Sequence, residues 1–251
     1  MSREGLRPSS GATAAGATVS ARMRPRSSFT ACALLGLGLL GGCGGSSSGN
    51  GVASKPPNEI VALSKAAADR ARSAHVSGSI VSGGSPITLN LDLATGGGRG
   101  QLALNGLGFE LIQTGGTVYI KGSPAFYRRI GGAAAAQLLQ GKWLKAPTTT
   151  PEFASISSLT DLHTLLNAAL SSHGTLVKTG TATINGQRVV GVSDQTRGGT
   201  LYVATSGQPY PVEIAKSGAG GGTVSFDRWN ETVSITPPAN AIDIAQLRAG
   251  H

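Results

Sequence analysis

Apolar and polar residues alternate with a period of two along the middle of the chain. Between residues 87 and 93 every second position is leucine or isoleucine, and the positions between them are Thr88, Asn90 and Asp92. This period is typical of a strand that buries one face and exposes the other to water. The pattern therefore predicts half-buried antiparallel strands, whose apolar positions are Ile87, Leu89, Leu91, Leu93, Leu102, Leu104, Phe109 and Leu111.

Further short apolar segments predict more strands of the same kind. They lie at residues 118–121, 176–179, 201–204, 212–215, 224–226 and 233–235. Asn185 and Gly186 predict a two-residue hairpin turn of type I′ between two of the strands. We expect about eleven strands in all, with the sheet ending before Pro237 and Pro238 because proline cannot donate a ladder hydrogen bond.

Helices are predicted where apolar residues recur at steps of three and four. Asn58 is placed to cap a first helix, whose apolar stripe continues to Ala74, and two shorter helices are expected between residue 124 and Leu139. A clearer helix begins after Ser158 or Thr160, closes at Gly174 and is polar on its outer face. Its apolar face consists of Leu162, Leu165, Leu166, Ala169 and Leu170. The mixture of strands and helices defines an α+β fold.

An apolar run of about a dozen residues near the start is too short to span a membrane, which takes roughly 20. Arg22, Arg24 and Arg26 precede this run, and small residues follow it. The arrangement is typical of a signal peptide, which we assign to residues 1–42. The basic region would be unusually long if translation began at Met1, so we predict that Met23 is the true start and that residues 1–22 are a spurious extension.

Cys43 follows a leucine and two glycines, a pattern that resembles the lipobox of bacterial lipoproteins. Cys43 would then be the first mature residue and would carry thioether-linked diacylglycerol. The alternative is an ordinary secretory cleavage site at which Cys43 has no special role. Cys32 would be removed with the signal peptide, so the mature chain has no partner for an internal disulfide. Residues 43–55 are rich in glycine and serine and predict a flexible tether before a domain spanning residues 56–251.

The formal net charge is +9, and charged residues make up only 13% of the chain. The basic residues are scattered, and aromatic residues, at 4%, do not interleave with them, so nucleic acid is not an expected partner. A positive face toward anionic lipid headgroups is one use of the charge. A merely solvated surface is the other.

Five segments carry a resemblance to a known family. In chain order they are GGTVYIKGSPAFYRRIG, GKWLKAP, INGQRVVGVSD, GTLYVATSGQPYPVEI and VSFDRWNETVSITPPANAIDI. With the lipobox and tether, they resemble the actinobacterial LppX/LprA/LprG-type lipoproteins, and the likeness extends from Asn58 to Ile244. The resemblance implies a LolA-like fold, in which a curved antiparallel sheet forms an unclosed half-barrel covered by helices. It also implies a non-catalytic lipoprotein that holds acyl chains of lipids or lipoglycans and carries them across the cell envelope.

An apolar sheet face needs a cover, and the helix that contains Leu162 is the best one available. Many residues nearby are Gly, Ala or Ser, which leave space, so we expect an apolar cavity between sheet and helix, although a filled core is the alternative for each residue. The expected lining residues are Leu89, Leu91, Leu104, Leu111, Val118, Ile120, Val203 and Phe226 from the sheet, and Leu162, Leu165 and Leu166 from the helix.

The sequence contains no recognisable catalytic motif. None of the histidines, His75, His163, His173 and His251, lies beside a nucleophile elbow, and no metal-ligand spacing occurs. We therefore expect a non-enzyme without a cofactor or a metal, acting as a monomer at the extracytoplasmic face of the cell membrane. Its expected partners are membrane lipids or glycolipids and the membrane that holds Cys43, with a membrane transporter as a candidate. The alternatives are an extracytoplasmic protein-binding regulator and an envelope scaffold.

Overall fold

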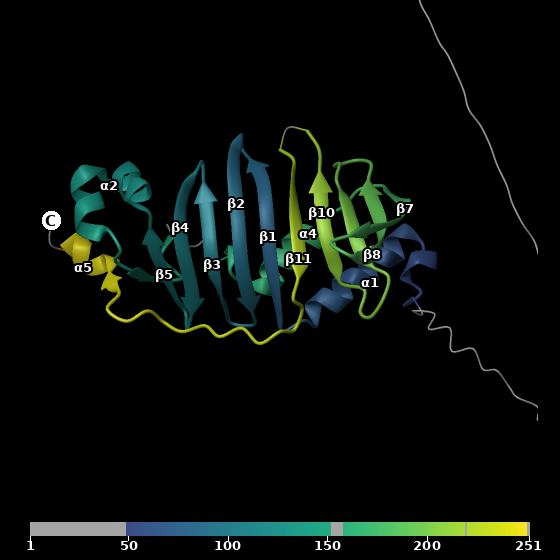
Figure 1. Ribbon diagram of the computed structural model, residues 1–251, viewed down its shortest axis with the longest axis horizontal. Coiled ribbons are helices and arrows are strands. Elements are labelled where there is room, and N and C mark those ends of the chain that lie inside the picture. The colour runs from purple at the N-terminus through teal and green to yellow at the C-terminus, as the bar shows by residue number, and fades with distance from the viewer. Residues whose placement is uncertain (1–48, 152–157, 219, 250–251) are drawn as a thin grey trace, which may run out of the picture. The chain divides into compact units, whose positions relative to one another are not determined.

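A single sheet of twelve strands organises the part of the chain that the structure, a computed structural model, describes: residues 49–151, 158–218 and 220–249 (Figure 1). The signal peptide, Met23 and Cys43 lie outside these residues. In spatial order the sheet runs β12-β6-β5-β4-β3-β2-β1-β11-β10-β9-β8-β7. Its two edge strands are not paired with each other, so the sheet is unclosed, as predicted.

The strands form two antiparallel meanders that meet where β1 pairs with β11. The first meander contains β1 (Ser73–Ser82), β2 (Ser85–Ala94), β3 (Gly97–Leu104), β4 (Leu107–Thr114), β5 (Thr117–Gly122) and β6 (Leu144–Pro147). The second contains β7 (Leu176–Ile184), β8 (Gln187–Asp194), β9 (Thr200–Ala204), β10 (Pro211–Lys216) and β11 (Gly222–Asp227). The hairpin between β7 and β8 is confirmed, because Asn185 and Gly186 have φ values of 49° and 78°.

Two strand predictions were wrong, namely a strand at residues 233–235 and the end of the sheet before Pro237 and Pro238. Residues 233–235 are not a strand, because the chain after β11 runs along one end of the first meander toward the opposite edge (Figure 1). There it adds β12 (Ile242–Asp243), which pairs with β6 in parallel. The sheet is therefore mixed rather than purely antiparallel, and a local apolar pattern could not distinguish a free segment from a paired one.

The described helices are α1 (Pro57–Asp69), α2 (Pro124–Leu139), α4 (Leu162–Leu170) and α5 (Ile244–Ala249), with a short 3₁₀ turn, η1 (Val52–Ser54). Helix α1 begins at Pro57, with Pro56 rather than Asn58 at its cap, and it ends before Ala74. Gly132, with a φ of 77°, interrupts α2. This agrees with the two helices expected there, because glycine adopts this left-handed conformation without steric cost.

The expected tether is shorter than residues 43–55, because the chain already packs on the domain at Asn50. The amide of Asn50 donates a hydrogen bond to the carbonyl of Thr205 at 2.8 Å, and its side-chain amide donates to the carbonyls of Ala204 and Gly207. Val52 is 2% exposed and packs against residues of α1, β8 and β9. The domain therefore starts ahead of residue 56, and the glycine and serine content alone did not reveal these contacts.

Candidate functional site

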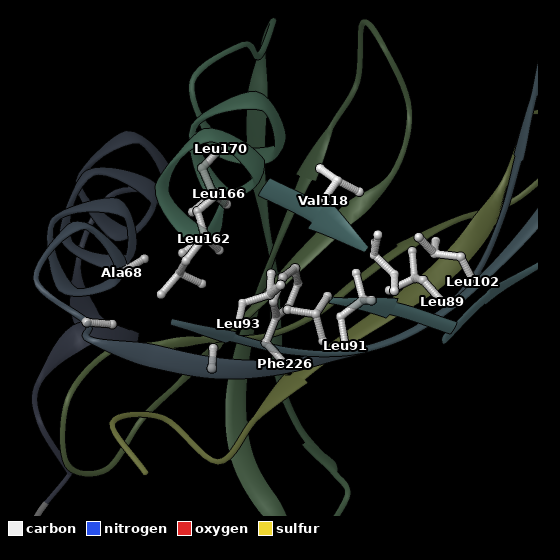
Figure 2. Packing of buried hydrophobic residues seen from close by; sticks show 14 of the residues in the cluster. Ala68, Leu89, Leu91, Leu93, Leu102, Val118, Leu162, Leu166, Leu170 and Phe226 are labelled. Atoms are coloured by element: carbon white, nitrogen blue, oxygen red, sulfur yellow. The ribbon is translucent and has the colours of Figure 1, made fainter. Parts of the chain in front are cut away.

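The face of the sheet that carries the alternating leucines is covered by α4, and this interface is the candidate site. Across the strands, Leu91 on β2 lies opposite Val76 on β1 and Gly100 on β3, and Gly100 lies opposite Leu111 on β4. Leu162, Leu166 and Leu170 of α4 belong to the same buried cluster as the leucines of these strands (Figure 2). We call this leucine-rich side the inner face.

Helix α4 is positioned by a cap and by a glycine. Its N-cap is Asp161, rather than Ser158 or Thr160, and the Asp161 carboxylate accepts a hydrogen bond from the amide of Thr164 at 2.7 Å. Just before the cap, the Thr160 carbonyl comes so close to β3 that a Cβ on Gly98 would lie 3.0 Å from it and 2.7 Å from Leu93. Only glycine leaves this space unoccupied, so Gly98 lets the start of α4 approach the sheet.

Two opposing effects act on the pKa of Asp161. Burial raises it, whereas hydrogen bonds from the side chain and backbone of Thr164 and the charge of His163 lower it. The lowering effects are larger together, so the pKa of Asp161 lies below its ordinary value. The cap is therefore ionised at neutral pH, where a negative charge near a helix N-terminus is favourable.

Most of the residues expected to line a cavity come together in one cluster. Leu165 packs at the margin of this cluster and is partly buried. The buried members that the sequence singled out are Leu89, Leu91, Leu111, Val118, Ile120, Leu162, Leu166 and Phe226, each at most 6% exposed. These side chains are packed against one another, so in this arrangement they form a core between sheet and helix (Figure 2). Their role as lipid lining stays a prediction.

Two expected lining residues lie elsewhere. Leu104, near the end of β3, is 38% exposed, because α4 does not extend over that end of the strand. Val203 is fully buried, but in a second cluster with Val52, Ile60 and Val61 beneath α1. The alternation of apolar and polar residues predicted the correct face of each strand. It could not show which helix, if any, covers each position along the strand.

An apolar hollow of about 150 Å³ lies where the end of α4 meets α1 and strands β8 to β10. None of the residues predicted as lining touches it. Sequence patterns did not predict this hollow, because the loops after α4 and after β8 form much of its wall, and loop residues show no periodicity. Its apolar wall consists of Val61, Leu170, Leu176, Val192, Leu201 and Ile214.

A larger hollow of about 610 Å³ crosses strands β2 to β5. Much of its lining is polar, including Asn90, Gln101, Glu110 and Lys121, which lie opposite one another in successive strands and alternate with the inner-face leucines. The ammonium of Lys121 pairs with the carboxylate of Glu110 at 2.8 Å. Leu89, one of the predicted lining residues, also lines this hollow with Leu102 and Phe109, and most of its exposed surface is apolar.

Among the described histidines, His75 is held by polar neighbours. His75 lies between the Asp227 carboxylate, 2.7 Å from Nδ1, and the Asn90 side-chain oxygen, 3.0 Å from Nε2, on the polar face. Within the described residues, no three His, Cys, Asp or Glu side chains gather in a way that could hold a metal ion. His251 lies outside them. No helix in the described ranges combines the length and apolar character that a membrane crossing requires.

The geometry thus defines a class of fold: an open mixed sheet whose apolar inner face is closed by helices. Two solved structures are similar to this chain. LprF from Mycobacterium bovis is 16% identical, with a TM-score of 0.51 over 73% of this chain and 97% of that one. The Mycobacterium tuberculosis lipoprotein LppX is 16% identical, with a TM-score of 0.48 over 71% of this chain and 99% of that one. No protein-family model matches the sequence, and neither does any curated protein. The likeness to LprF confirms the fold that the resemblance implied.

Proposed function

We propose that this chain is a membrane-anchored lipoprotein that binds lipid acyl chains between its open sheet and α4 and carries them across the cell envelope without catalysis. The observation that carries the proposal is the cover of the inner face. A broad apolar surface on a twelve-strand sheet is closed there by a helix of nine residues, with an apolar hollow at its end.

The energetics favour a removable cover. Burying one leucine side chain stabilises a protein by about 1.5–3 kcal/mol, so the three buried leucines of α4 hold it with roughly 5–9 kcal/mol. Transferring an acyl chain of about sixteen carbons out of water contributes roughly 13 kcal/mol at about 0.8 kcal/mol per methylene. An entering acyl chain can therefore replace the leucine contacts, and the displaced leucines can pack on the chain instead of on the sheet.

The sequence features outside the described residues fit the same proposal. An acylated Cys43 would hold the domain at the extracytoplasmic face of the membrane, where its lipid ligands are. Residues 44–49 would act as the tether, because Asn50 is already bound to the domain. The fold that the chain shares with LprF agrees with the family resemblance of the sequence, and that resemblance favours lipid binding rather than catalysis.

Native mass spectrometry of the full-length protein, purified from its own membranes without added lipid, tests this proposal. We expect mass increments of lipid size that disappear in organic solvent, which distinguishes bound lipid from the covalent acyl chains on Cys43. Leu201→Trp, at a partly buried wall position of the hollow, should lower the lipid occupancy. Val177→Trp, at a strand position that is 46% exposed, is the matched control and should not.

A folded wild-type protein without any bound lipid would contradict the proposal, and a co-purifying protein in its place would favour a regulator. Lipid transfer between membranes requires a second measurement. The protein should accelerate the transfer of a fluorescent phospholipid from donor to acceptor vesicles, and Leu201→Trp should reduce this acceleration more than Val177→Trp does.

A further inference from the structure

The 150 Å³ hollow has cations at its outer margin, although its wall is apolar. His173, Arg197 and Lys216 are all exposed residues of this margin, and each comes from a different segment. His173 follows α4, Arg197 lies in the turn between β8 and β9, and Lys216 ends β10. The sheet order β10-β9-β8 brings these three segments together. Asp194 is the acidic residue among the lining residues.

Asp194 is engaged by the backbone. Its carboxylate accepts hydrogen bonds from the amides of Thr196 at 2.8 Å, Arg197 at 2.9 Å and Gly174 at 2.8 Å. The bonds from Arg197 and Gly174 hold the pKa of Asp194 below its ordinary value, so the group is ionised and acts as a fixed acceptor. It ties the loop after α4 to the turn after β8, and its oxygens are occupied in that role.

Neither permanent cation is held in a close ion pair, although the charge of Arg197 also helps to lower the pKa of Asp194. Within residues 49–151, 158–218 and 220–249, neither Arg197 nor Lys216 forms an ion pair within 4.0 Å. Lys216 lies against the turn that carries Arg197, since a Cβ on Gly198 would be 3.6 Å from its Cε. The glycines at 198 and 199, with φ values of 73° and 96°, leave this side of the turn without side chains. Both cations can therefore reach one group at the mouth.

The size of the hollow limits how much of a ligand can lie behind the group that the two cations bind. A dry apolar cavity of about 150 Å³ accommodates a molecule of the size of benzene, or roughly six carbons. Leu170 belongs both to this wall and to the buried row of α4 leucines. A longer acyl chain that enters here would therefore continue along the contact between α4 and the sheet.

We propose that this hollow is the headgroup end of the lipid site, and that Arg197 and Lys216 select amphiphiles whose headgroup carries a carboxylate or a phosphate. This inference rests on the proposed function and specifies the class of ligand. Anionic oxygens form charge-assisted hydrogen bonds with guanidinium and ammonium groups, which are about twice as strong as neutral ones. His173 lies at the same margin.

Competition binding with the full-length protein held in amphipol tests the inference. A neutral fluorescent probe, N-phenyl-1-naphthylamine, is displaced by two matched pairs of amphiphiles, each below its micelle concentration. Dodecanoate against dodecanamide tests a carboxylate, and lauroyl lysophosphatidic acid against monolauroylglycerol tests a phosphate. We expect the anionic member of at least one pair to bind at least about tenfold more tightly, a factor that corresponds to about 1.4 kcal/mol. The preference should shrink as salt screens the charges.

The double variant Arg197→Gln/Lys216→Gln should lose most of this preference, because it binds the anionic members more weakly than the wild type does. Arg128→Gln/Arg129→Gln removes the same charge from exposed positions on α2 and should keep the preference. The conservative pair Arg197→Lys/Lys216→Arg should retain it as well.

A wild type that binds anionic and neutral members equally, or a double variant that keeps the full preference, would overturn the inference and leave the proposed function standing. A folded wild type that binds no member of either pair would instead refute the proposed function itself, together with this inference.

Discussion

Replacing Leu166 by alanine tests whether α4 can leave the sheet while the sheet stays folded. Leu166 is 1% exposed and belongs to the buried cluster on the inner face. A buried Leu→Ala substitution destabilises by about 3 kcal/mol or more, because it removes apolar contacts and leaves a cavity. The free energy of opening α4 should therefore fall by this amount, and its amides should exchange roughly 100-fold faster.

Native-state hydrogen exchange at several urea concentrations is the assay. If α4 opens alone, its amides exchange through a reaction that exposes little surface, so the exchange depends weakly on urea. The amides of β2 and β3 should exchange only through global unfolding, with a steep dependence on urea. Asn167→Ala is the control, because Asn167 is an exposed neighbour on the same helix and its replacement should change stability by less than about 0.5 kcal/mol.

The decisive comparison is between α4 and the central strands of the wild type. If the amides of α4 and of β3 share one opening free energy and one urea dependence, the helix unfolds only with the whole domain. In that case α4 is a fixed part of the core. The proposed entry of acyl chains beneath it would then be wrong, whatever the stability of Leu166→Ala.

Three further predictions concern the cap, the sheet and the N-terminal segment. Asp161→Ala should destabilise by about 1 kcal/mol at pH 7 in urea denaturation, as for the loss of a helix N-cap. The pKa of Asp161 is lower in the folded than in the unfolded protein. Its contribution to the free energy of unfolding is therefore present above the unfolded pKa and is lost as the pH falls through the folded pKa. Variant and wild-type stabilities that still differ by the same amount at pH 2 would contradict this. Gly100→Val should prevent stable folding, seen as a large drop in Tm, since a Cβ there would lie 2.1 Å from the Asn90 carbonyl oxygen. Val52→Asp should expose the segment before α1 to limited proteolysis, because it places a charge at a site that is 2% exposed; unchanged cleavage would mean that the packing of this segment is dispensable.

The sequence predicted those features that short-range rules determine. Alternation assigned the inner face of β2 to β5, because side chains on a strand point to opposite faces in turn. The Asn185–Gly186 turn was predicted because few other residues tolerate a positive φ at both turn positions. The apolar face of α4 followed from its leucine spacing, but both of its ends were misplaced. The N-cap is Asp161 rather than residue 158 or 160, and the helix ends at Leu170, ahead of the predicted Gly174.

Features that depend on distant parts of the chain could not be predicted this way. Nothing local distinguishes Val203 from the inner-face valines, yet α1 rather than α4 covers it. Leu104 continues the alternation of β3, but its exposure depends on where α4 ends in space. Asn50 and Val52 occur in a segment with the composition of a linker, and only the presence of the Thr205 carbonyl and the α1 surface gives them contacts.

By itself, the sequence determined the faces of the strands and the identity of the covering helix, because each is encoded within about ten neighbouring residues. Only the tertiary structure decided that the inner face is packed beneath α4 and that a hollow remains at its end. It also decided that Arg197 and Lys216 stand together there. These residues are brought together by the pairing order of β8, β9 and β10, and pairing order results from the packing of the whole sheet rather than from any local pattern.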